Sequence, residues 1–187
     1  MKTKIIFVRH GEVNNPNNIW YGRIPGFYLS KKGKSQISET AHKLAKNKIA
    51  AIYASPLLRT KQSAKIIANV LNLPIKYDSK LLEVNSSWQG KTISYINSHS
   101  DNFNIYASST KNITGETIEK LSDRVQQFIN SIISVNKDAS IVVVTHGDPI
   151  MIVKALVNKL PITISSLRQK DKYIKEGEFF IAEFNSQ

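Results

Sequence analysis

The fold is decided by the stretch KIIFVRHGE, residues 4–12, in which a strand pattern runs directly into charged and polar residues. Residues 5–8 are apolar and mostly β-branched, which is typical of a strand buried on both faces of a parallel sheet. Ligands of open α/β sheets bind beyond the carboxyl ends of the strands. Arg9 there carries a rigid fork of donors suited to phosphate, and Gly11 allows a ligand to approach the backbone. His10 can be an acid–base group, a metal ligand, a nucleophile or simply a hydrogen-bonded polar residue.

The composition is typical of a soluble globular protein. The 187 residues are 41% hydrophobic and 21% charged, and neither a repeat nor a linker divides them, so we expect a single domain over residues 1–187. Cysteine is absent, which excludes thiol chemistry and favours a cytoplasmic location. We find no signal-peptide pattern and no apolar stretch long enough to span a bilayer, so we expect no membrane partner.

The formal net charge of +12 raises the question of nucleic-acid binding. Many of the lysines lie on predicted helices, where they are explained as solvated side chains. No helix-turn-helix, zinc-finger or aromatic–basic RNA motif accompanies them. We therefore expect no nucleic-acid partner, and we interpret the positive charge as attraction for a small anionic substrate.

Strand and helix patterns alternate along the chain. A long loop rich in Asn, Pro and Gly separates the first strand from the first helix, and loops of this length are usually functional. The predicted strands are residues 4–8, 50–54, 75–77, 140–145 and 179–184, and the predicted helices follow Ser30, residues 55–60, residues 115–117 and Asp148, which we expect to cap the last of them.

Three predicted junctions between a strand and the next helix carry charged or imidazole side chains. They are RHG at residues 9–11, SPLLR at 55–59 and HG at 146–147. If the strands are parallel neighbours, these groups meet at one edge of the sheet. Arginines, histidines and helix N-termini together form an anion site, and phosphate is the anion they suit best. Two histidines at equivalent strand ends, each followed by glycine, favour a functional site over packing.

These motifs resemble those of the histidine phosphatase superfamily, which includes the cofactor-dependent phosphoglycerate mutases. They follow the order of the family and cover almost the whole chain. The resemblance implies a three-layer α/β/α fold with a mostly parallel sheet and a small cap of loops and short helices over residues 85–115. It is carried by RHGE at 9–12, SPLLRT at 55–60 with Gln62 and Ala64, LLE at 81–83, GET at 115–117 and HG at 146–147.

The resemblance also implies a phosphohistidine mechanism. His10 would attack the phosphoryl group, which requires a neutral reacting nitrogen, so we expect a backbone carbonyl to hold its other ring N–H. Arg9, Arg59 and a protonated His146 would surround the transferring oxygens. Glu83 would protonate the leaving oxygen and then activate water. We expect no metal and no cofactor, because the two arginines supply the charge that a metal would provide.

Further residues fall where members of the family bind substrate. Arg23 is the strongest candidate in the loop after the first strand, although an exposed loop arginine is often only solvated. The start of a helix explains Thr117 about as well as substrate contact does. The residues predicted to bind substrate are Gly11, Asn17, Tyr21, Gly22, Arg23, Thr117 and Gly147.

The sequence departs from the family pattern just after Glu83. Ser87 stands where glycine is usual and Gln89 where glutamate is usual, which puts the geometry around Glu83 in question. Asp148 follows the second histidine. Helix capping is sufficient to explain it, and a carboxylate there can also raise the pKa of His146.

We predict a phosphatase that acts on a small anionic phosphorylated metabolite. No arginine lies between Arg59 and Arg124, so the cap lacks the arginine pair of the family's mutases. Mutase-type phosphoryl transfer is the alternative, and a phospho-ligand-binding module without activity is a second alternative, since fold does not guarantee function. The sequence does not indicate the oligomeric state or the particular substrate.

Overall fold

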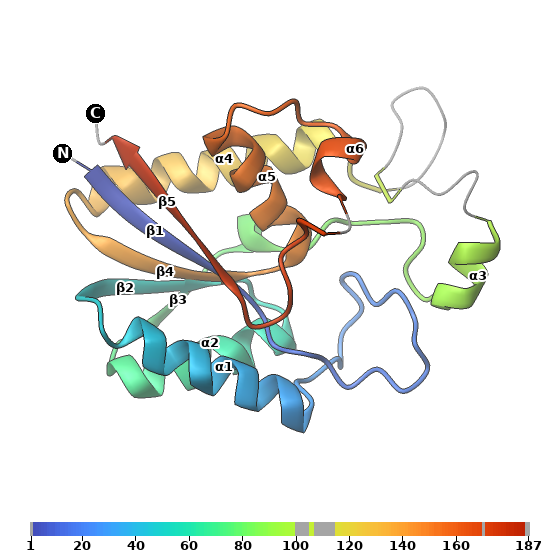
Figure 1. Cartoon of the computed structure of the whole chain (residues 1–187), viewed down its shortest axis with the longest axis horizontal. Helices are drawn as coiled ribbons and strands as arrows, with labels where there is room; N and C mark the ends of the chain where they lie inside the picture. Colours follow the sequence, from blue (N-terminus) through green and yellow to red (C-terminus); the bar gives the residue numbers. More distant parts are fainter. Residues whose placement is uncertain (1, 100–104, 107–114, 170, 186–187) are drawn as a thin grey trace.

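A single sheet with helices on both faces forms the described part of the chain, which comprises residues 2–99, 105–106, 115–169 and 171–185 of a computed structural model (Figure 1). Its strands, in the spatial order β3-β2-β4-β1-β5, are β1 (Lys2–Arg9), β2 (Ile49–Ala54), β3 (Ile75–Tyr77), β4 (Ser140–Thr145) and β5 (Phe179–Asn185). All neighbouring pairs are parallel except β1 and β5, which are antiparallel.

The alternation of side chains along β1 divides the core into two layers. Ile6 and Val8 pack with one set of helices, whereas Ile5 and Phe7 pack with the other. The first set is α1 (Lys31–Leu44) and α2 (Leu58–Leu71), and the second is α4 (Ile118–Val135) and α5 (Gly147–Val157). The predicted three-layer α/β/α architecture with a mostly parallel sheet is therefore confirmed.

The first residues of helices α1 and α5 test the predictions of their N-cap residues. Ser30 caps α1 as predicted, because its hydroxyl accepts a hydrogen bond from the Gly33 N–H over 2.9 Å. The prediction for Asp148 is wrong. α5 begins at Gly147, so His146 is the N-cap residue and Asp148 lies inside the first turn.

The long loop and the predicted cap lie at the same end of the molecule (Figure 1). The loop is closed at its base by a bridge between Val13 and Leu29, and a second bridge joins Ile19 to Thr92. Thr92 caps the short helix α3 (Ile93–Ser98), which is one of the short cap helices that the sequence predicts. Residues 100–104 and 107–114 of the predicted cap lie outside the described residues. None of the described helices is both long and apolar enough to cross a membrane.

Two glycines determine how closely the end of β1 approaches α1. A Cβ atom on Gly11 would overlap the carbonyl of Gly33, and one on Gly33 would overlap the carbonyl of Glu12. The close approach that Gly11 permits in this structure is to α1, and its predicted contact with a ligand stays a prediction. The contact with α1 fixes the backbone directly after His10 against a rigid helix.

We predict that Gly33→Ala destabilises the protein. Alanine in place of glycine inside a helix ordinarily stabilises by up to about 1 kcal/mol. Here the clash with Glu12 should outweigh that gain and lower the free energy of unfolding by roughly 1–3 kcal/mol. Urea titration measures the change, with Ser35→Ala on the exposed face of the same helix as the control. A Gly33→Ala protein as stable as the control would contradict the prediction.

Candidate active site

The three predicted junctions meet at one edge of the sheet. Arg9 pairs with Thr145 in the parallel ladder of β1 and β4, so the residues that follow them, His10 and His146, lie side by side. Their ring centroids are 5.2 Å apart. The side chain of Arg59, at the start of α2, reaches the same point, with its Nε 3.2 Å from Nε2 of His10.

The hydrogen bonds of His10 define its tautomer. Nδ1 lies 2.8 Å from the carbonyl oxygen of Gly11, so this nitrogen carries the proton. Nε2 faces the N–H donor of Arg59 and therefore presents its lone pair. Burial, followed by the charges of Arg59 and Arg9, lowers the pKa of His10 well below its ordinary value. The backbone carbonyl that the sequence analysis expects on the other ring nitrogen is thus present, and the imidazole is neutral.

The two ring nitrogens of His146 have different surroundings. Its Nε2 lies 2.8 Å from the hydroxyl of Ser55, and its buried Nδ1 has no hydrogen-bond partner among the described residues. Burial and the charge of Arg59 lower the pKa of His146 well below its usual value, so the ring is neutral and carries a single proton; its protonation next to substrate stays a prediction. Asp148 does not pair with it. That carboxylate accepts two hydrogen bonds from Nη2 of Arg168, at 2.7 and 2.9 Å, and one from the Tyr173 hydroxyl at 3.1 Å.

Backbone carbonyls orient the two arginines of the site. Arg59 is almost fully buried, donates from Nη2 to the carbonyl of Gly22 over 2.6 Å, and lies with Cζ 4.8 Å from the ring centroid of Tyr21. Arg9 donates from Nη1 to the carbonyl of Ile174 over 2.6 Å, while its buried Nε has no partner among the described residues. Arg9 also forms an ion pair with Glu176 over 3.4 Å. Arg59 has no ion-pair partner among the described residues, so its positive charge is left to attract an anion.

Glu83 supplies the carboxyl group of the site. It lines a cavity of about 310 Å³ that also contains Arg9 and Tyr21. Its Oε1 accepts a hydrogen bond from the Val84 N–H over 2.9 Å. Burial, and then the negative charge of Asp148, raise the pKa of Glu83 to about 7. A carboxyl with this pKa can both donate and accept a proton near neutral pH.

The predicted substrate-binding residues divide into two groups. Tyr21 and Gly22 line the cavity. The others have different positions. Asn17 is exposed in a turn, and Asn15 and Asn18 line the cavity instead. Arg23 donates to the Glu83 carbonyl and to Glu116, and Thr117 caps α4.

The two glycines pack against other parts of the protein. Gly11 packs against Gly33, and Gly147 packs against the hydroxyl of Tyr173, which a Cβ atom on Gly147 would overlap.

Sequence reasoning missed the residues that the C-terminal segment brings to the cavity. Arg168 follows the short helix α6 (Ile164–Leu167), and its Cζ lies 5.0 Å from the ring centroid of Trp20 in the loop after β1. Tyr173 and Glu176 line the same wall. These residues lie in an irregular stretch without periodicity or motif, so only their charged and aromatic character could have drawn attention to them.

The described residues present an anion site next to a proton donor. Arg59 contacts His10, whose ring lies against that of His146, and Arg9 and Glu83 line the adjoining cavity. In the described part of the chain, no three histidine, cysteine or carboxylate side chains come together as ligands of a metal ion. A neutral imidazole beside two guanidinium groups is an arrangement that suits the binding of a phosphate group.

The chain belongs to the histidine phosphatase superfamily (branch 1), whose family model matches residues 5–171. It is 41% identical over 92 residues to the uncharacterized protein Rv0525 of Mycobacterium tuberculosis, a match that covers 49% of this chain and 46% of that protein, so the chain matches about half the length of this relative. Phosphoserine phosphatase 1 of Hydrogenobacter thermophilus is 28% identical, covering 78% of this chain and 72% of that protein.

Two further comparisons extend the range of relatives. The 2,3-bisphosphoglycerate-dependent phosphoglycerate mutase of Thermoplasma acidophilum is 29% identical, with 78% of this chain and 71% of the mutase covered. The solved structure of Bacillus stearothermophilus YhfR superimposes with a TM-score of 0.83 at 25% identity, covering 96% of this chain and 90% of that one. The family, and the fold on which the site stands, are thus established together.

We predict that His10 stays neutral in the folded protein well below the pH at which histidine ordinarily titrates. Its Nδ1 should carry the proton and Nε2 should be unprotonated, as nitrogen-15 NMR of the ring resolves. In denaturant the same ring should titrate at its ordinary pKa of about 6.5. A folded-state titration at that ordinary value would contradict the argument from burial and the arginine charges.

We further predict that Glu83→Gln stabilises the protein at alkaline pH. An unfolded glutamate titrates at about 4.3, whereas the pKa of folded Glu83 is about 7, so between these values the native state binds more protons and stability falls as pH rises. Glutamine removes this cost. We expect the variant to gain roughly 2 kcal/mol over the wild type at pH of about 8 and almost nothing at pH of about 4. A gain independent of pH in denaturant titrations would show that ionisation is not its cause.

Proposed function

We propose that the protein is a phosphatase that hydrolyses phosphomonoesters through a phosphohistidine intermediate, without a metal or cofactor. The observation that carries the proposal is the state of His10. Its Nδ1 proton is fixed on the Gly11 carbonyl, so Nε2 is the unprotonated nitrogen, and this nitrogen accepts a hydrogen bond from Nε of Arg59 over 3.2 Å. An unprotonated ring nitrogen next to a guanidinium group supports the proposal, because the guanidinium would bind the phosphoryl oxygens while the nitrogen attacks phosphorus.

The first step is attack by Nε2 of His10 on phosphorus. A P–N bond forms, the P–O bond to the leaving group breaks, and protonated Glu83 transfers its proton to the leaving oxygen. Arg9 and Arg59 stabilise the charge on the transferring oxygens. The negative charge of the bound phosphoryl group opposes the effects that lower the pKa of His146, so this ring can take up a proton when substrate binds.

The second step is hydrolysis of the phosphohistidine. The Glu83 carboxylate takes a proton from water as the oxygen attacks phosphorus. The P–N bond then breaks, phosphate leaves, and His10 and Glu83 return to their starting states. A carboxyl with a pKa near the working pH serves both steps, because it must give a proton in the first and accept one in the second.

The cavity favours a small anionic substrate. It measures about 310 Å³, the chain carries a net charge of +12, and Trp20 and Ile19 give one wall an apolar surface for the leaving group. Relatives of the chain include both a phosphatase and a mutase by name. We favour hydrolysis because no arginine lies between Arg59 and Arg124 to hold the carboxylate of a phosphoglycerate. The cytoplasmic location and the absence of nucleic-acid partners stay predictions.

The proposal predicts phosphate release from p-nitrophenyl phosphate that a chelator does not affect. His10→Ala should lower this activity by about a thousandfold or more, because it removes the nucleophile. The control is His42→Ala on the exposed face of α1. Radiolabelled substrate should leave an acid-labile, alkali-stable phosphate on the wild type and none on His10→Ala. Loss of activity with the chelator would reject the metal-free mechanism, and faster interconversion of phosphoglycerate isomers than phosphate release would identify a mutase.

The pH profile tests the role of Glu83. With phenyl phosphate, whose leaving group needs a proton, kcat/KM should fall as pH rises through about 7, the pKa of Glu83, because only the protonated form donates. In Glu83→Gln this limb should disappear and the rate should fall by about 10²–10⁴. A wild-type profile that is flat across neutral pH would exclude Glu83 as the proton donor.

A further inference from the structure

Glu83 lies on a stretch of chain that has no regular secondary structure. It follows the short 3-10 helix η1 (Ser79–Leu81), and residues 82–86 belong to neither a helix nor a strand. A proton donor must be held close to its productive position, because small displacements cost large factors in rate. The fixation of this carboxyl must therefore come from contacts with other segments.

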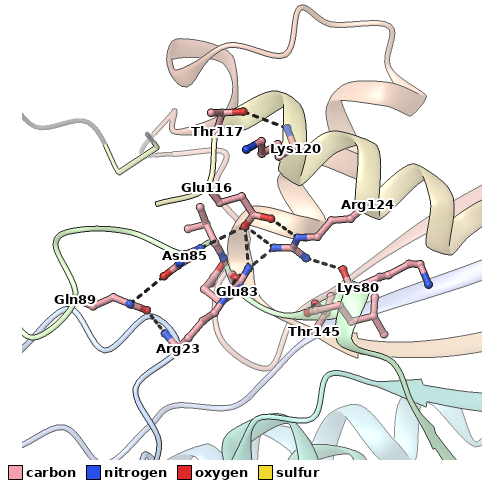
Figure 2. Close-up of polar contacts among 12 residues, drawn as sticks. Arg23, Lys80, Glu83, Asn85, Gln89, Glu116, Thr117, Lys120, Arg124 and Thr145 are labelled. Atoms are coloured by element: carbon pink, nitrogen blue, oxygen red, sulfur yellow. Dashed lines mark hydrogen bonds and ion pairs between the residues drawn. The ribbon is translucent and has the colours of Figure 1, made fainter. Parts of the chain in front are cut away.

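Two arginines bind the backbone of this stretch (Figure 2). Arg23 donates from Nε to the Glu83 carbonyl over 2.6 Å, and Arg124 donates to the same oxygen from Nη2 over 3.2 Å. Arg124 also donates from Nη1 to the carbonyl of Lys80 over 2.6 Å. One arginine comes from the loop after β1 and the other from α4, so the stretch is held from two sides.

The peptide group between Glu83 and Val84 links these contacts to the carboxyl. Its carbonyl oxygen accepts from Arg23 and Arg124, and its N–H donates to Oε1 of Glu83 over 2.9 Å. Because a peptide group is planar, fixing the carbonyl also fixes the direction of the N–H. The orientation of the arginines is therefore transmitted to the carboxyl of Glu83.

Glu116 orients both arginines. Its Oε1 accepts from Nε of Arg124 over 2.6 Å, and its Oε2 accepts from Nη2 of Arg124 and from Nη2 of Arg23, each over 2.9 Å. The side chains of Glu116, Arg124 and Arg23 are only 12, 15 and 28% exposed. Figure 2 shows Glu116 between the two guanidinium groups and next to Glu83.

Electrostatics explains why the carboxylate is needed there. Burial acts to raise the pKa of Glu116, but the hydrogen bonds and charge of Arg124 and the charge of Arg23 outweigh it and the pKa is lowered. Glu116 is therefore ionised at neutral pH. Burial lowers the pKa of Arg23, the charge of Glu116 raises it, and the charge of Arg124 lowers it further, because the two guanidinium groups repel each other. The negative charge of Glu116 therefore allows the two positively charged guanidinium groups to bind the same carbonyl oxygen, that of Glu83.

We propose that Glu116 is a positioning residue for the proton transfer at Glu83, and that it acts through Arg23 and Arg124 on the Glu83–Val84 peptide group. The proposal rests on the proposed function, in which Glu83 is the proton donor. It also reassigns Arg23, which the sequence analysis expects at the substrate, to the support of Glu83.

The test compares two substrates that differ mainly in their need for a proton. Phenyl phosphate has a basic leaving group that must be protonated, whereas the p-nitrophenolate of p-nitrophenyl phosphate leaves with little help. Glu116→Gln should lower kcat for phenyl phosphate by about tenfold and kcat for p-nitrophenyl phosphate by less than about twofold, with little change in either KM. The matched control is Glu119→Gln, the same change on the exposed side of α4, which should leave both rates unchanged.

A second variant separates positioning from folding. Breaking a buried ion pair can unfold a protein, so circular dichroism must show that Glu116→Gln is folded at the assay temperature. If it is not, Arg23→Lys keeps the positive charge next to Glu116 but lacks the Nε donor to the Glu83 carbonyl. We expect the same selective loss on phenyl phosphate from this variant.

The outcomes distinguish this proposal from the proposed function. Glu83→Gln should show the strongest dependence on the leaving group, and if it shows none, the role of Glu83 as proton donor fails. If Glu83→Gln is selective but folded Glu116→Gln or Arg23→Lys slows both substrates equally, or neither, then Glu116 has a structural role only and the positioning proposal is overturned.

Discussion

The register between β1 and β4 is the constraint on which the site depends. Arg9 opposite Thr145 places the next residue of each strand, His10 and His146, at the same height on the sheet edge. A slip of one residue would turn every side chain of the strand to the opposite face. The two-layer core makes such a slip costly, because Ile5 and Phe7 would exchange environments with Ile6 and Val8. The packing of the core thus determines the positions of His10 and His146.

Around this edge backbone carbonyls orient the two arginines. The Gly22 carbonyl orients Arg59, the Ile174 carbonyl orients Arg9, and both histidines remain neutral. Arg9 also forms an ion pair with Glu176 at 3.4 Å, and further ion pairs join Glu116 to Arg124 and Asp148 to Arg168. Among the described residues Arg59 has no ion-pair partner, so its positive charge favours a phosphate dianion, whereas the surrounding ion pairs provide rigidity.

Much of this site could be predicted from sequence, because its central residues follow strands and carry a motif. Position at the junction between a strand and the next helix was enough to predict that His10, Arg59 and His146 come together. The roles of Arg23 and Asp148 were not predictable, since they depend on contacts with Glu116 and Arg168, which lie far away in the chain. The burial that keeps His146 neutral in this structure was not predictable, because motifs contain no information on burial. The wall formed by Tyr173 and Glu176 comes from a segment without periodicity, whose position only tertiary packing decides.

The strand order also determines when the site becomes complete during synthesis. β1 is made first, but its neighbours in the sheet are β4 and β5, and the carbonyl that orients Arg9 belongs to Ile174. A nascent chain that ends before residue 168 carries both histidines and Glu83, but it lacks Arg168, Tyr173 and the last strand. Residues 168–176 must therefore be synthesised before the cavity wall that they form and the carbonyl that orients Arg9 are in place.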